Sequence, residues 1–154
     1  MSTSYVSPET FADLSTMPRE DIELLFSADA SWLSKQLISA SRRIDGRLAK
    51  RYAVPFETPV PEIVVYWVVR IVTPIAYLRR GVSPRDEQYV AIREDGEQAW
   101  TEVGEAADSK DGLFELPLRA DTTMNGVSKG TPLGSSDASP YAWLDTQWEA
   151  VTNG

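Results

Sequence analysis

Apolar residues recur at helical spacing over most of the chain up to about Gly104. The longest stripe falls between Asp29 and Arg51, where apolar side chains return at steps of three and four: Ala30, Leu33, Leu37, Ala40, Ile44 and Leu48. This spacing places side chains on one face of an α-helix. We expect the helix to begin with Asp29 as its N-cap. We expect it to end before Pro55, because the residue before a proline is pushed out of helical geometry.

Gly46 lies inside this predicted helix. Glycine in a helix interior is about 1 kcal/mol less favourable than alanine. A close approach of another helix would explain the glycine, and a local kink would explain it equally well.

Two short helices are predicted before the long one. Ser7-Pro8-Glu9 combines a capping side chain, a proline suited to the first turn and an acid, so a helix should follow to about Leu14. Pro18-Arg19-Glu20-Asp21 repeats this pattern and opens a second short helix that holds Ile22, Leu24 and Leu25.

The segment 61–80 is apolar on nearly every side, which is typical of a helix at the centre of a bundle or between subunits. Its β-branched residues favour a strand, but its length, Pro61 at the start and Gly81 at the end favour a helix. Pro74 should bend this helix. Arg70 needs a partner if it is buried, and we expect a structural ion pair.

A last helix should run from Ser83-Pro84-Arg85-Asp86-Glu87 to Gly104, followed by a strand or extended piece at Leu113-Phe114-Glu115-Leu116. Residues 120–140 are rich in Thr, Ser, Gly and Pro and should form a loop or linker. We therefore predict a mainly α protein. Residues 1–118 form a small bundle of about four to five helices, and residues 119–154 form an extended, mostly irregular C-terminal arm.

The amino-acid composition excludes several kinds of catalytic and metal-binding site. The 154 residues include no cysteine and no histidine. Disulfides, Ser–His–Asp and Cys–His catalysis, and zinc sites built on Cys or His are therefore excluded. The acids are scattered, and no spacing selects a catalytic pair. We expect no catalytic, cofactor-binding or metal-binding residues, and no enzyme activity.

The charge is unevenly distributed. Residues 1–80 hold 10 basic and 9 acidic residues, whereas residues 81–154 hold 5 and 14, within a net charge of −8. Such a chain lacks the basic footprint that grips nucleic acid, but it could surround DNA as passing cargo. The apolar stretch 63–78 is too short to span a membrane. We expect no targeting segment, no membrane partner and a cytoplasmic location while the protein is being made.

The C-terminal segment carries four large apolar side chains, Tyr141, Trp143, Leu144 and Trp148. Aromatic residues anchor protein interfaces, and they also dominate cores. The segment is therefore either an arm that docks on another protein or an arm folded back on its own bundle.

A basic stripe on the long helix comprises Arg43, Arg47 and Arg51, at steps of four. The later helix offers acids, among them Asp86, Glu94 and Asp95. Most charge runs are solvated faces. Alternatively, the basic face of one copy meets the acidic face of the next in a head-to-tail ring.

The run from Ala40 to Phe56, ASRRIDGRLAKRYAVPF, resembles the small adaptor (head-completion) proteins of tailed phages, in the Mu-like branch of the connector family. Members read roughly A-S-x-x-I-D-x-x-L-x-x-R-Y-x-x-P in their long helix, after an early tyrosine that matches Tyr5. An apolar central helix and an acid-rich helix ending in glycine follow. The resemblance covers about residues 5–118.

This resemblance implies a helical bundle that docks on the portal ring after DNA packaging. The adaptor would form a homo-oligomeric ring, typically a dodecamer, and extend the DNA channel towards a downstream neck or tail-completion protein. It also implies a location in the virion neck, with residues 119–154 as the portal-binding arm. The arm is longer and richer in tryptophan than the family pattern, which leaves its docking site open.

Two other functions remain open from the sequence. A soluble helical binding or regulatory module could use the aromatic tail on a host protein. A carboxylate-based enzyme such as a lysin is the more remote alternative.

Overall fold

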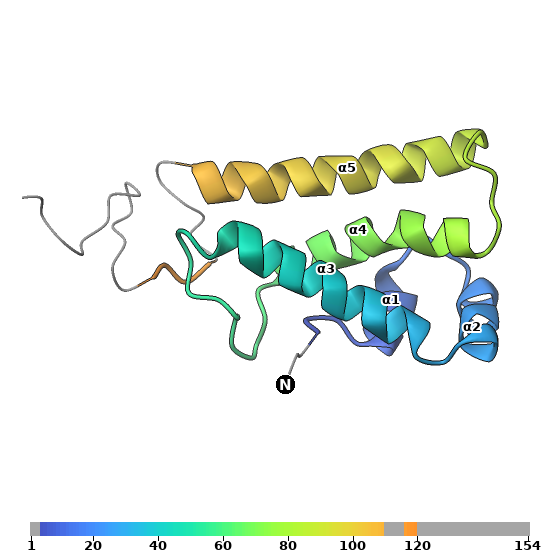
Figure 1. Ribbon diagram of the computed structural model, residues 1–154, viewed down its shortest axis with the longest axis horizontal. Helices are drawn as coiled ribbons and strands as arrows, with labels where there is room; N and C mark the ends of the chain where they lie inside the picture. Colours follow the sequence, from blue (N-terminus) through green and yellow to red (C-terminus); the bar gives the residue numbers. More distant parts are fainter. Residues whose placement is uncertain (1–3, 110–115, 120–154) are drawn as a thin grey trace, which may run out of the picture.

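The computed structural model describes residues 4–109 and 116–119. These residues form five helices, α1 (Pro8–Leu14), α2 (Arg19–Ala28), α3 (Trp32–Leu48), α4 (Glu62–Arg79) and α5 (Glu87–Asp108) (Figure 1). No strand occurs in the described ranges, although Tyr52 and Leu118 form an isolated antiparallel bridge. The predicted small, mainly α bundle is confirmed.

The two short helices begin where the sequence signals placed them. The Ser7 side chain accepts a hydrogen bond from the Thr10 N–H at 3.1 Å, and Pro8 occupies the first turn of α1. Pro18 directly precedes α2, whose buried residues are Ile22 and Leu25. The Ser7 cap satisfies a backbone N–H group that the start of α1 leaves unpaired, whereas α2 has no side-chain cap.

The long helix α3 is shorter than predicted at both ends. It begins at Trp32 rather than Asp29, because the Asp29 carboxylate accepts the Ser31 N–H at 2.9 Å and holds the preceding residues in a turn. Its last helical residue is Leu48. The apolar stripe is confirmed for buried Leu33, Leu37, Ala40, Ile44 and Leu48, whereas Ala30 lies before the helix and is exposed.

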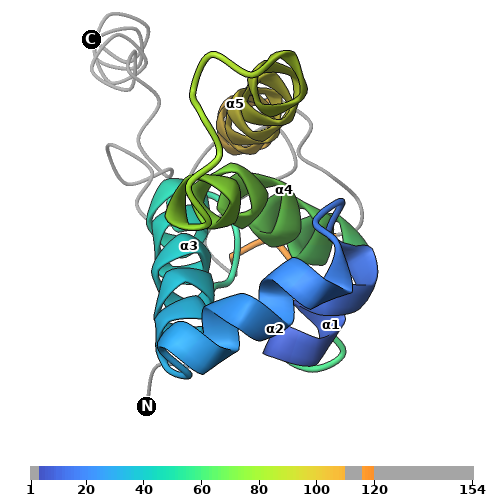
Figure 2. The ribbon, with the colours of Figure 1, turned by 90° about the vertical axis from the view of Figure 1, so that its right-hand side faces the viewer.

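Helix α4 lies at the centre of the bundle. In Figures 1 and 2, α5 lies on one side of α4, and α1 and α2 lie on the opposite side. Ten α4 residues are buried, among them Trp67, Val68 and Val72. The apolar character of this segment on nearly all sides therefore follows from its central position.

Helix α5 extends one turn beyond Gly104, the predicted end, to Asp108. Ala106 and Ala107 in this extra turn are buried, and the Tyr52 hydroxyl donates a 2.7 Å hydrogen bond to the Ala106 carbonyl. A tyrosine distant in sequence thus caps a carbonyl group that the helix end leaves unpaired.

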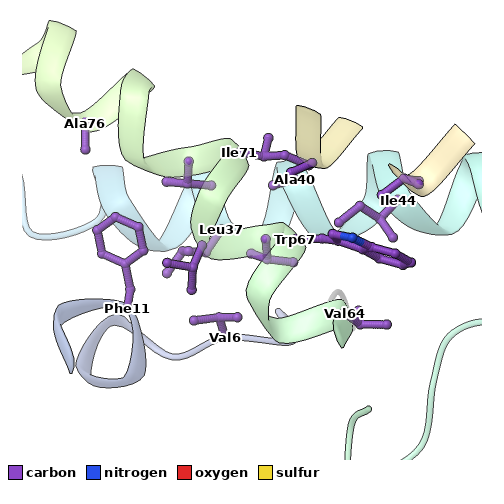
Figure 3. Packing of buried hydrophobic residues seen from close by; sticks show 14 of the residues in the cluster. Val6, Phe11, Leu37, Ala40, Ile44, Val64, Trp67, Ile71 and Ala76 are labelled. Carbon is purple, nitrogen blue, oxygen red and sulfur yellow. The ribbon is translucent and has the colours of Figure 1, made fainter. Parts of the chain in front are cut away.

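One continuous core joins the helices. Figure 3 shows side chains of α1, α3 and α4, together with Val6, pointing towards one another. Leu116, after α5, is buried against the same core at 3% exposure. Because these side chains form one cluster, the described residues fold as one unit.

Candidate interaction surfaces

A polar network fastens α5 to α4. The Arg70 guanidinium contacts the carboxylates of Asp95 and Glu102, each at 2.9 Å. The Trp67 indole N–H also donates to Glu102 at 2.9 Å. The hydrogen bond with Asp95 is the main reason that the pKa of Arg70 is raised. The ion pair expected for Arg70 is confirmed, and its partners lie on the neighbouring helix.

Helix α5 packs tightly against α4 at Gly96. A Cβ added to Gly96 would lie 2.9 Å from the Arg70 carbonyl oxygen and 3.1 Å from Pro74 Cγ. Proline has no N–H to donate to the carbonyl four residues earlier, so Pro74 leaves the Arg70 carbonyl without its helical partner. No local pattern in the sequence points to a role for Gly96, because only its spatial neighbours reveal one.

The predicted basic stripe faces α5 of the same chain. The Arg43 guanidinium lies 4.8 Å from the centre of the Trp100 ring. Arg47 contacts the Asp108 carboxylate at 3.4 Å, and Lys50 forms an ion pair with the same carboxylate. The Lys50 contact is the largest cause of the lowered pKa of Asp108. Arg43 and Arg47 therefore have partners within their own chain, and their predicted contact with a second copy stays a prediction.

Arg51 lies beyond the end of α3 and is 8% exposed. Its Nη1 is buried without a hydrogen-bond partner among the described residues. Its backbone carbonyl accepts the Arg119 N–H at 2.9 Å. Arg51 is thus part of the packed interior near the end of α3, whereas the sequence placed it on a subunit interface.

The three acids proposed for the opposing interface have different surroundings. Asp86 caps α5 by accepting the Gln88 N–H at 2.9 Å. Asp95 contacts Arg70 on α4, and Glu94 is exposed. Because adjacent helical positions diverge by about 100°, Glu94 and Asp95 do not share one face.

A second polar cluster joins the N-terminal segment to the motif run. The Tyr5 hydroxyl donates to the Asp45 carboxylate and accepts the Phe56 N–H at 2.9 Å. The Tyr5 N–H donates to the Ser41 hydroxyl at 3.1 Å. Burial raises the pKa of Asp45, and burial is also the main cause that raises the pKa of Tyr5. The residues Tyr5, Ser41 and Asp45, which carried the family resemblance, are therefore in contact.

Residues 116–119 pack along the end of α3. The Ala53 N–H donates to the Pro117 carbonyl at 2.8 Å, and the Arg119 side chain donates to the Ala49 carbonyl at 3.0 Å. The chain therefore leaves the described bundle at a fixed position. The predicted arm residues Tyr141, Trp143, Leu144 and Trp148 lie outside the described residues.

A groove between α1 and α2 was not anticipated from the sequence. It has a volume of about 420 Å³, and apolar Ala12, Ile22 and Phe26 lie beside the acids Glu9, Asp13 and Glu23. Arg19 also lines the groove and pairs with Asp13 at 2.6 Å. The acids occur at helical spacing on two separate helices, so only their packing could reveal the groove.

The described part of the chain contains no group of three or more acids placed to hold a metal ion. None of its helices is long and apolar enough to cross a membrane. The polar side chains described above chiefly join one helix or segment to another. The fold and these contacts define the class as a small α-helical bundle protein with charged outer surfaces.

The family comparison then identifies the chain. The model of the family described as Bacteriophage Mu, Gp36 matches residues 7–124, and the chain belongs to that family. It is a bacteriophage protein, and this membership favours a structural, head-related one. Comparison with curated proteins and with solved structures found no significant match.

Proposed function

We propose that this protein is a non-enzymatic head–tail adaptor of the virion neck. It docks on the portal ring after DNA packaging and extends the DNA channel towards a downstream neck or tail-completion protein. The observation that carries the proposal is the family match over residues 7–124, which includes the motif residues Ser41 and Asp45. Tyr5, which lies just before this range, contacts both of them.

The bundle suits a protein that presents an arm. Hydrogen bonds at Ala49, Arg51 and Ala53 hold residues 117–119, so the following residues start from a rigid base. A rigid base reduces the conformational freedom lost when an attached segment binds. We propose that residues 119–154 contact the portal through Tyr141, Trp143, Leu144 and Trp148.

The charge supports a channel role. Residues 81–154 hold 14 acidic and 5 basic residues. An acidic surface repels the DNA backbone, so DNA can pass without being retained. The proposed assembly is a homo-oligomeric ring, a dodecamer where the portal has twelve subunits.

Co-sedimentation with the portal ring encoded by the same phage tests the proposal. We expect the purified full-length protein to sediment with the portal. Protein that stays in the supernatant at high concentration and low salt would contradict the proposal and favour a host-protein partner.

The arm is tested by deletion of residues 120–154, which keeps Arg119 and its bonds to Ala49 and Arg51. We expect the shortened protein to retain its helical circular dichroism and to lose portal binding. The matched control is the full chain with Ser135→Ala and Ser136→Ala, which should bind as the parent does. Normal docking by the shortened protein would remove the arm from the mechanism.

A further inference from the structure

The outer face of α3 consists of Lys35, Ile38, Ser39, Arg42 and Gly46. The first four are among the residues lining a shallow hollow of about 370 Å³. They lie on the side of the helix opposite to buried Leu37 and Ile44, as their spacing requires. Ile38 is half-buried and stands between two cationic side chains on this face.

Gly46 extends this outer face by one more turn from Arg42. A Cβ added there would meet nothing within 4 Å. Glycine is among the least favourable residues in a helix interior, and no close approach within the described chain requires it here. An approach by a second chain would use the absence of a side chain.

The groove between α1 and α2 has the complementary character. Ala12, Ile22 and Phe26 provide its apolar lining. Glu9 and Glu23 are exposed at the groove, and the third acid, Asp13, is already paired with Arg19. An apolar side chain flanked by two cations therefore matches this groove, because the groove has an apolar lining beside two exposed carboxylates.

We propose that the outer face of α3 on one copy docks in the α1–α2 groove of the next copy. Ile38 packs over the apolar lining of the groove, while Lys35 and Arg42 approach Glu9 and Glu23. The outer face of α3 and the α1–α2 groove are different surfaces of the bundle. Contact between two different surfaces is heterologous and can close into a ring.

This contact deepens the proposed function, because it supplies the contact between subunits of the proposed ring. It differs from a contact between the Arg43–Arg47 stripe and the acids of α5. Arg43 and Arg47 already contact Trp100 and Asp108 of their own chain. The outer face of α3 leaves those contacts intact.

Disulfide cross-linking tests the contact, and the absence of native cysteine makes the background zero. The full-length chain with Ser39→Cys and Glu9→Cys should form a ladder of multimers on oxidation. Either single variant should give no ladder. The matched control carries Ser39→Cys and Glu94→Cys. Its second cysteine replaces an exposed acid of α5 that lies outside the proposed contact, so this variant should stay monomeric on oxidation.

A charge exchange provides the second readout. Lys35→Glu in the Ser39→Cys chain should slow its cross-linking to a Glu9→Cys chain several-fold. Adding Glu23→Lys to the Glu9→Cys chain should restore the rate. Gly46→Ala should also slow cross-linking, while each variant keeps its helical circular dichroism.

Cross-linking is measured in the free protein at high concentration and in the portal-bound protein. A ladder from the Ser39–Glu9 pair in either state supports the contact. The absence of a ladder in both states, or a ladder from the Ser39–Glu94 pair instead, overturns it. A ladder without portal co-sedimentation would keep the contact and refute the adaptor function, so the two failures are distinguishable.

Discussion

Two glycines inside helices have opposite surroundings. Gly96 lies against the backbone of α4, where Pro74 leaves the Arg70 carbonyl without its helical partner. Gly46 lies on the outer face of α3 with open space beside it. The sequence drew attention to Gly46 through its place inside a predicted helix, whereas the role of Gly96 depends on a helix distant in the chain.

Alanine substitutions should separate the two glycines. Gly96→Ala should lower the free energy of unfolding by about 1–3 kcal/mol, because the nearest obstacle is backbone and cannot move aside cheaply. Gly46→Ala should raise it by up to about 1 kcal/mol through helix propensity. Urea denaturation of the two variants and the parent measures both changes. A stability gain at Gly96 would contradict the packing described for α4 and α5.

The Trp67–Arg70–Glu102 network makes a second prediction at the residue scale. Glu102→Ala leaves the Trp67 N–H and one side of the Arg70 guanidinium without their acceptor. The free energy of unfolding should therefore fall by about 1–3 kcal/mol. The matched control is Glu97→Ala on the same helix, whose exposed pair with Arg93 spans 3.6 Å. Exposed pairs of this type contribute about 0–1 kcal/mol. Equal losses in the two variants, measured by thermal denaturation, would refute a structural role for the network.

At the scale of elements, helix positions followed from local sequence, but several ends did not. Pro8 occupies the first turn of α1, which proline suits, and Pro61 directly precedes α4 as its N-cap residue. Gly104 did not end α5, because the following alanines are buried and Tyr52 caps the Ala106 carbonyl. Such contacts join residues far apart in the sequence, so no local pattern could have predicted them.

The contacts of the candidate interface residues on α3 were also only partly predictable from local sequence. The spacing of Arg43 and Arg47 correctly indicated a shared face of the helix. It could not indicate that the face is turned towards Trp100 and Asp108 of the same chain. Arg51 continues the spacing in sequence, but α3 ends at Leu48 and the side chain is buried.

The attachment of the N-terminal segment to α3 should depend on pH through Asp45. Burial raises the pKa of Asp45 above the ordinary value of 3.8. Between the ordinary pKa of Asp45 in the unfolded chain and its raised pKa in the folded protein, the folded protein binds more protons than the unfolded chain. The contribution of Asp45 to the free energy of unfolding therefore falls as pH rises through this range. Asp45→Asn should abolish that component. The free energy of unfolding of the Asp45→Asn variant, relative to that of the parent, should therefore increase from below pH 3.8 towards neutrality. A stability difference that is constant with pH, measured by urea denaturation, would contradict this account.

At the scale of the whole molecule, the protein combines a packed five-helix bundle with charged outer surfaces. The polar contacts described above chiefly hold the bundle together. The groove between α1 and α2 and the outer face of α3 are left on its outside. A rigid body whose two outer surfaces contact each other, as proposed for the groove and the outer face of α3, can be repeated around a ring.

The central claim is that many copies of this protein dock on one portal ring. Native mass spectrometry of the purified portal incubated with excess full-length protein counts the bound copies directly. The account predicts saturation at one copy for each portal subunit, with few partly filled rings when neighbouring copies stabilise one another. Saturation at a single copy per ring, or no bound copy at any concentration, would contradict it.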